Sequence, residues 1–84
     1  MIFTVDLQLV QKTLDKMDAA IRRRLLRSVC SLTLDPRPPG ARKLEGVSNT
    51  WRVRVGDYRI LYIIRDDRLL VLVISIGHRR EVYR

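Results

Sequence analysis

Apolar and polar residues alternate strictly over residues 51–55, Trp-Arg-Val-Arg-Val, which is the period of a β-strand with one buried face. A second apolar segment begins at Tyr58, and only Gly56 and Asp57 separate the two. Gly-Asp fits a two-residue hairpin turn, because glycine adopts the positive φ that such turns require. Counting outward from this turn predicts the pairs Val55–Tyr58, Arg54–Arg59 and Arg52–Leu61.

Two segments before this hairpin carry apolar residues at helical spacing, and each follows an aspartate that can cap a helix, Asp6 or Asp18. Residues 2–5 predict a short strand. The second helix is expected to end at Asp35-Pro36, since proline disfavours helical backbone in the residue before it. The apolar positions are Leu7, Val10, Leu14 and Met17 in the first helix and Ile21, Leu25, Val29 and Leu32 in the second.

The predicted order of elements is β-α-α-β-β-β, in a single domain of residues 1–84. We therefore expect an α+β fold in which a helical hairpin packs on one face of a small, mostly antiparallel four-stranded sheet. A second two-residue turn, at Asp66-Asp67, would pair Arg59 with Ile74, Leu61 with Leu72 and Ile63 with Leu70. The face expected to lie under the helices carries Trp51, Val53, Val55, Tyr58, Ile60, Tyr62, Ile64, Val71 and Val73.

Arg52, Arg54 and Arg59 then share the other face of the sheet, and Arg54 faces Arg59 directly. Like charges opposite each other on adjacent strands cost roughly 0.2–1 kcal/mol, so folding gains nothing from this arrangement. One interpretation is an ordinary solvated face that happens to be basic. The other is a site for an anionic ligand, which Arg79, Arg80 and Tyr83, just after the last strand, favour. The rest of this face is apolar, which suits a protein partner.

The net charge of the chain suits several kinds of anionic partner and does not by itself distinguish among them. Seventeen basic and nine acidic residues give a net charge of +8 and a pI near 10.8, which suits nucleic acid, an anionic membrane or an acidic protein. The first residues do not resemble a signal peptide, and the longest apolar stretch is too short to span a bilayer. The single cysteine, Cys30, indicates a reducing cytoplasm, and we expect it to be a buried or half-buried hydrophobe rather than a nucleophile.

The basic and aromatic residues suggest binding and cleavage of a phosphodiester. Guanidinium groups bind phosphates in a forked geometry, and several together stabilise charge that develops in a transition state. Tyr83 can stack on a base or exchange a proton, and His78 belongs to the residue type that titrates near neutral pH; either could instead be structural. The sequence shows no carboxylate pair or ligand cluster that suggests a metal or another cofactor. A nuclease here would be metal-independent, with the 2′-hydroxyl of RNA as its nucleophile.

Three stretches of the chain together resemble the RelE/ParE superfamily of bacterial and archaeal toxins, and within it the RelE branch. They are Lys-Leu-Glu-Gly at 43–46, Trp-Arg-Val-Arg-Val-Gly-Asp-Tyr-Arg-Ile at 51–60 and Ile-Ser-Ile-Gly-His-Arg-Arg-Glu-Val-Tyr at 74–83. The resemblance implies the toxin of a type II toxin–antitoxin system, a ribosome-dependent endoribonuclease that cuts mRNA in the ribosomal A site. It also implies a cognate RelB-like antitoxin that neutralises the toxin.

By motif, the resemblance assigns catalytic roles to Arg52, Arg54, Arg59, Arg79 and Tyr83, and we expect Arg80, His78 and Lys43 to bind substrate. The best-understood pattern of the family has lysines where this chain has Arg52 and Arg54. Arginine is a poor proton shuttle because it stays protonated. Proton transfer would then fall to Tyr83, with or without His78, or cleavage would depend mainly on electrostatics and substrate positioning.

Two other functions stay open. A ParE-like toxin would share the fold and would inhibit DNA gyrase by binding it, without nuclease chemistry. A plain basic RNA-binding module would have no activity at all. Residues 77–83, with paired arginines and a tyrosine, favour the nuclease, because a gyrase inhibitor has no evident need for a convergent phosphate site.

Overall fold

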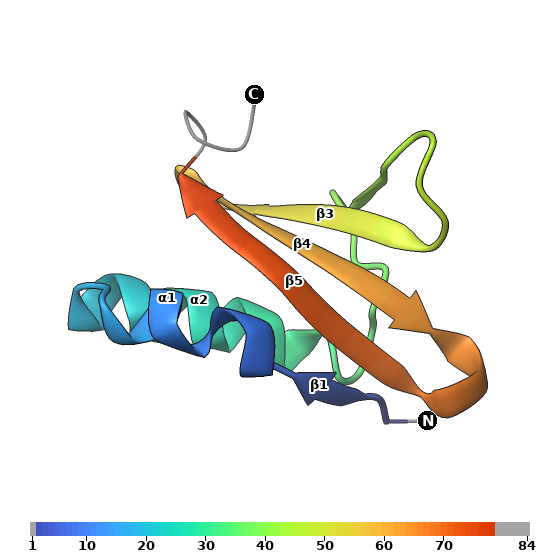
Figure 1. Cartoon of the computed structure of the whole chain (residues 1–84), viewed down its shortest axis with the longest axis horizontal. Coiled ribbons are helices and arrows are strands. Elements are labelled where there is room, and N and C mark those ends of the chain that lie inside the picture. The colour runs from blue at the N-terminus through green and yellow to red at the C-terminus, as the bar shows by residue number, and fades with distance from the viewer. Residues whose placement is uncertain (1, 79–84) are drawn as a thin grey trace.

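The computed structural model describes residues 2–78, which form two helices packed on one five-stranded sheet (Figure 1). The strand order is β1-β5-β4-β3-β2; β1 runs parallel to β5, and the other neighbours are antiparallel. The elements are β1 (Thr4–Asp6), η1 (Gln8–Val10), α1 (Gln11–Asp15), α2 (Ala19–Ser31), β2 (Arg42–Lys43), β3 (Thr50–Val55), β4 (Tyr58–Arg65), η2 (Asp66–Arg68) and β5 (Leu70–His78).

The predicted α+β architecture is confirmed, and the sheet has one strand more than expected. The additional strand is β2, which pairs Arg42 with Arg52 and Lys43 with Trp51 at the edge of the sheet. Two residues are too few to show a period in the sequence, so this strand could not be found from the pattern of apolar positions. Within residues 2–78, no helix is long and apolar enough to cross a membrane.

The helical hairpin forms where it was predicted, with shorter helices. The Asp6 carboxylate accepts from the Gln8 N–H at 2.9 Å, and the chain then makes the single 3-10 turn η1 before α1 rather than one continuous helix. The Asp18 carboxylate accepts from the Ala20 N–H at 3.2 Å, which confirms the predicted cap of α2.

α2 ends at Ser31, before the predicted Asp35-Pro36. The Ser31 hydroxyl donates to the Ser28 carbonyl at 2.6 Å, and the Thr33 hydroxyl donates to the Cys30 carbonyl at 2.8 Å. The backbone N–H groups of Leu32 and Thr33 donate to carbonyls three residues back, at 3.0 and 3.1 Å, so the α-helical pattern ends before the proline.

The hydrophobic core lies between the helices and the predicted face of the sheet, and Tyr62 is its largest fully buried side chain. Trp51, Val53, Val55 and Tyr58 are partly buried at its margin. Cys30 is exposed, contrary to expectation, because it follows Val29 by one residue and so lies about 100° around α2 from the apolar stripe. The buried residues are Val10, Leu14, Leu25, Val29, Leu32, Ile60, Tyr62, Ile64, Val71, Val73 and Ile76.

The connector from α2 to β2 is fastened to the sheet at two successive residues. The Tyr62 hydroxyl donates to the Pro36 carbonyl at 2.8 Å, and burial raises the pKa of Tyr62 to about 12. Both terminal nitrogens of Arg37 donate to Asp66, at 2.8 and 3.2 Å, and the guanidinium lies 5.4 Å from the centre of the Trp51 ring. This bidentate hydrogen-bonded pair raises the pKa of Arg37 and lowers that of Asp66.

The β3–β4 hairpin has the predicted register, with Arg54 opposite Arg59 and Gly56 at φ 60° in the turn. The predicted β4–β5 register is wrong. The pairs are Arg59–Gly77, Leu61–Ser75 and Ile63–Leu72, instead of Arg59–Ile74, Leu61–Leu72 and Ile63–Leu70.

Two features cause this shift in register. η2 and Leu69, at φ 49°, make a longer connection than the two-residue turn expected at Asp66-Asp67, so Arg65 pairs with Leu70. The register then changes again between Leu61 and Tyr62, where Ile74 is the additional residue on β5. The bulge keeps Val73 and Ile76 in the core and brings Gly77 opposite Arg59.

Candidate active site

Four arginines lie on the face of the sheet that the helices leave uncovered, which we call the arginine face. Arg52 and Arg54 are two residues apart on β3, so they point to the same side of the sheet. Arg59 lies opposite Arg54 on β4, and Arg42 lies opposite Arg52 on β2. The arginine face is therefore defined by Arg42, Arg52, Arg54 and Arg59 on three adjacent strands. The predicted grouping of the three strand arginines is present.

The four guanidinium groups differ in exposure. Arg42 and Arg54 are exposed, Arg52 is half-buried, and Arg59 is only 2% exposed. Opposed like charges are destabilising, and burying a charge is costly. Gly77 lies opposite Arg59 on β5, so the neighbouring strand places no side chain beside it on that side. A buried, positioned cation next to exposed ones is suited to hold an anion in a fixed place.

His78 does not lie on the arginine face. It pairs with Tyr58, a residue of the helix side, and the two rings meet edge to face with their centres 5.4 Å apart and an interplanar angle of 82°. Arg24 of α2 lines the same hollow of about 290 Å³ as these two rings. The sheet thus separates His78 from Arg54 and Arg59 within the part of the chain that the structure describes.

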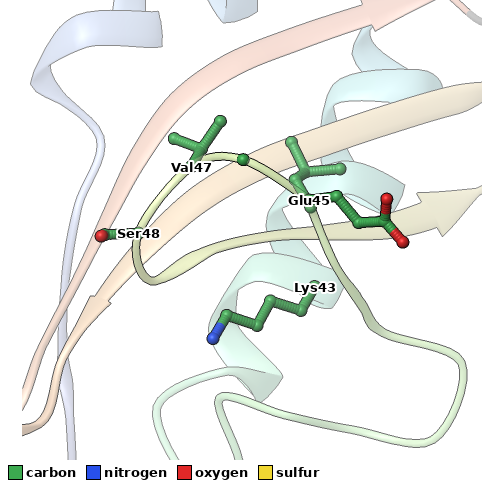
Figure 2. Close-up of a pocket in the computed structure, with 6 residues that line it drawn as sticks. Lys43, Glu45, Val47 and Ser48 are labelled. Carbon is green, nitrogen blue, oxygen red and sulfur yellow. The ribbon is translucent and has the colours of Figure 1, made fainter.

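Lys43 is likewise apart from the arginines. It pairs with Trp51, which belongs to the helix side of the sheet, and it lines an open hollow of about 530 Å³ made by the loop after β2 (Figure 2). Figure 2 shows the Lys43 ammonium and the Glu45 carboxylate pointing away from each other. The remaining sequence-predicted site residues, Arg79, Arg80 and Tyr83, lie outside the described residues.

Arg42 is the residue of the arginine face that sequence reasoning did not select. Its neighbour Lys43 was chosen from a motif, whereas strand pairing puts Arg42 beside Arg52. The only signal in the sequence is that Arg42 begins a short basic stretch before β3. Across residues 2–78, no three His, Cys, Asp or Glu side chains gather where they could hold a metal ion.

Comparison with known proteins identifies the class of protein that this fold and site define. The family model for the ParE toxin of type II toxin–antitoxin systems (parDE) matches residues 7–83. The mRNA interferase toxin RelE of Escherichia coli is 31% identical over 72 residues, which cover 81% of this chain and 75% of RelE. The chain therefore belongs to the RelE/ParE family of type II toxins.

Solved structures agree in fold. The archaeal RelE–RelB complex from Pyrococcus horikoshii contains a chain that is 29% identical, with a TM-score of 0.78, and the match covers 94% of this chain and 97% of that chain. In the intact RelBE toxin–antitoxin complex of E. coli, the matched chain is 25% identical with a TM-score of 0.76, over 93% of this chain and 96% of that one. The RelE-like fold extends over nearly the whole chain.

Proposed function

We propose that this toxin is an endoribonuclease that inhibits translation by cutting mRNA in the ribosomal A site, in the cytoplasm and without a metal ion or other cofactor. The observation that carries the proposal is the pairing of exposed Arg54 with buried Arg59, next to Arg52, on the uncovered face of the sheet. Three fixed cations at one place suit a phosphodiester whose charge rises during cleavage.

The relatives support nuclease chemistry over gyrase inhibition. RelE of E. coli, with 31% identity, is named an mRNA interferase, and a chain of Shigella flexneri with the same identity carries the name mRNA interferase RelE. The matched structures of P. horikoshii and E. coli are complexes of RelE with RelB. A RelB-like antitoxin is therefore the partner we propose for this chain.

The reaction we propose needs no external reactant. The 2′-oxygen of one nucleotide attacks the adjacent phosphorus, the bond from phosphorus to the 5′-oxygen of the next nucleotide breaks, and the products end in a 2′,3′-cyclic phosphate and a 5′-hydroxyl. The 2′-hydroxyl loses a proton, and the leaving 5′-oxygen gains one. Arg54, Arg59 and Arg79 hold the non-bridging oxygens and stabilise the charge that builds on them, while Arg52 positions the strand.

Proton transfer is the part of this mechanism that arginine performs poorly, since the guanidinium stays protonated. We assign this transfer to Tyr83. His78 lies beside Tyr58 on the helix side of the sheet. Lys43, His78 and Arg80 are proposed to bind substrate, and for Lys43 and His78 that means RNA away from the scissile phosphate.

Primer extension on a defined mRNA, with programmed 70S ribosomes, tests the proposal. Wild-type protein is expected to cut inside the A-site codon only when ribosomes are present; Arg79→Ala should abolish the cut, and Arg54→Ala should weaken it strongly. Arg27→Ala, at an exposed position on α2, is the control for loss of one positive charge. The absence of a cut, in a protein that still arrests growth when expressed, would favour gyrase as the target.

A further inference from the structure

The edge of the sheet at β2 and β3 carries a basic hollow. Arg42, Arg52 and Arg54 line it together with Pro39, Gly40 and Val53, and its volume is about 330 Å³. The described residues that line it include three arginines and no acidic side chain. The hollow is therefore a place of concentrated positive charge at the open end of the arginine face.

The hollow has a constrained wall. The Ala41 N–H donates to the Pro38 carbonyl at 3.0 Å, and Gly40 adopts φ 91° between them, with no atom within 4 Å of the position a Cβ would take. Upstream, Arg37 fastens the same connector to Asp66. These contacts fix the approach of the chain to β2, and with it the position of Arg42 beside Arg52.

We propose that this hollow is a second phosphate subsite, in which Arg42 and Arg52 hold the backbone phosphate next to the one that is cut. The inference rests on the proposed function and deepens it, since it assigns Arg42 to the binding of the RNA strand. Arg52 and Arg54 are two residues apart, about 6–7 Å along β3, a step that suits neighbouring phosphates of one strand. The forked guanidinium of Arg42 matches the geometry of phosphate oxygens.

RNA fits this hollow better than an acidic peptide does, because of what it adjoins. Arg52 and Arg54 line the hollow, and Arg54 also lies directly opposite Arg59 in the proposed cleavage site. The phosphate next to the scissile one lies one nucleotide along the RNA strand, so the group that binds it has to adjoin the cleavage site. Arg42 is exposed at the sheet edge, where a strand leaving the site would pass.

The test measures single-turnover cleavage of ribosome-bound mRNA at increasing toxin concentration. Arg42→Ala is expected to raise the half-saturating concentration about tenfold and to change the maximal rate by less than about twofold. Arg42→Lys keeps the charge and loses the forked guanidinium, so its half-saturating concentration should fall between those of wild type and Arg42→Ala. Arg68→Ala, an exposed arginine of η2, is the matched control, and unchanged thermal unfolding midpoints establish that each variant folds.

A set of mRNAs with one neutral methylphosphonate at each position flanking the cut locates the contact. At one flanking position, the neutral group should weaken wild-type binding about as much as Arg42→Ala does, with no further effect in the Arg42→Ala variant.

Arg42→Ala behaving like Arg68→Ala would overturn the subsite while leaving the nuclease proposal intact. So would an Arg42→Ala variant that binds the antitoxin less tightly and mRNA normally. A wild-type protein that does not cut mRNA would overturn both proposals.

Discussion

Arg54 and Arg59 lie directly opposite each other across β3 and β4, yet Arg54 is exposed and Arg59 is only 2% exposed. Substitutions at these two positions therefore have different consequences for folding, even if both side chains act on the same phosphate. An exposed arginine can be removed at little cost to the fold, whereas a buried one leaves a cavity.

Arg54→Ala is expected to lower the cleavage rate about a hundredfold, because one cationic donor to the transition state is lost. Its free energy of unfolding should change by less than about 0.5 kcal/mol. Arg59→Ala should lose cleavage and, in addition, about 1–3 kcal/mol of stability. Single-turnover cleavage and denaturant unfolding of the two variants measure both quantities. Wild-type cleavage by folded Arg54→Ala would rule out its proposed role.

Tyr83→Phe is expected to reduce cleavage more than ribosome binding, because the substitution removes the hydroxyl that we assign to proton transfer and keeps the ring. Cleavage is followed in a single turnover with saturating toxin, and binding by co-sedimentation with programmed ribosomes. Unchanged cleavage would reduce Tyr83 to a stacking or packing residue.

Tyr62 makes stability depend on alkaline pH. Its pKa in the folded protein, about 12, exceeds the ordinary value of 10.0 because the side chain is buried. Its contribution is complete below pH 10 and is lost as the pH rises from 10 to 12, when the unfolded chain ionises first. The total loss is about 2–3 kcal/mol.

Tyr62→Phe should remove that part of the alkaline decline. At pH 7 it should cost about 1 kcal/mol, because the Pro36 carbonyl loses its 2.8 Å hydrogen bond. Urea unfolding of both proteins at pH 7 and pH 11, with tyrosinate absorbance as a second probe, measures the difference. Parallel stability curves for the two proteins would contradict the assignment.

The Arg37–Asp66 pair makes the stability of the protein depend on pH in the acidic range. The hydrogen bonds from Arg37 lower the pKa of Asp66 below its ordinary 3.8, so its contribution is present above pH 4 and disappears as the pH falls through the lower, folded value. Asp66→Asn should be slightly less stable than wild type at pH 7 and equal to it near pH 2. Added salt should shrink the difference, because both side chains are exposed to solvent, Arg37 by 39% and Asp66 by 59%.

Asp67→Asn is the matched control for this pair. Asp67 lies in the same turn, and its contact with Arg65 is longer, at 3.7 Å. Thermal unfolding from pH 2 to pH 7, at low and high salt, compares the two variants. An Asp66→Asn protein whose deficit persists at pH 2 would show that its effect comes from the turn rather than from the charge pair.

Local signals accounted for most of the fold. The β3–β4 register followed from Gly56-Asp57 alone, because a two-residue turn leaves no freedom in pairing. The β4–β5 register did not follow, since nothing in the sequence marks Leu69 for a left-handed backbone or Ile74 for a bulge. Both features involve strands far apart in the sequence: the Leu69 carbonyl accepts from the Thr4 N–H at 2.7 Å, and the bulge lies between β4 and β5.

Local signals in the sequence likewise predicted part of the site. Alternation along β3 places Arg52 and Arg54 on one face, but it does not reveal that Arg59 is buried. Arg42 was missed because its position depends on a two-residue strand. His78, which we expect to bind substrate, lies on the opposite face of the sheet from the arginines, because side chains alternate between the two faces of β5 and position 78 falls on the side of Tyr58.

The parallel pairing of β1 with β5 has a consequence for how the chain acquires its structure during synthesis. Thr4 pairs with Leu70, and Asp6 pairs with Leu72, so the two partners are made more than sixty residues apart. A nascent chain that lacks Leu70–His78 has no strand to join β1 to β4, and its helices have only part of a surface to cover. Such non-local pairing disfavours stepwise folding as the chain emerges. The domain should collapse in a single late event, only after residue 78 has left the ribosome that made it.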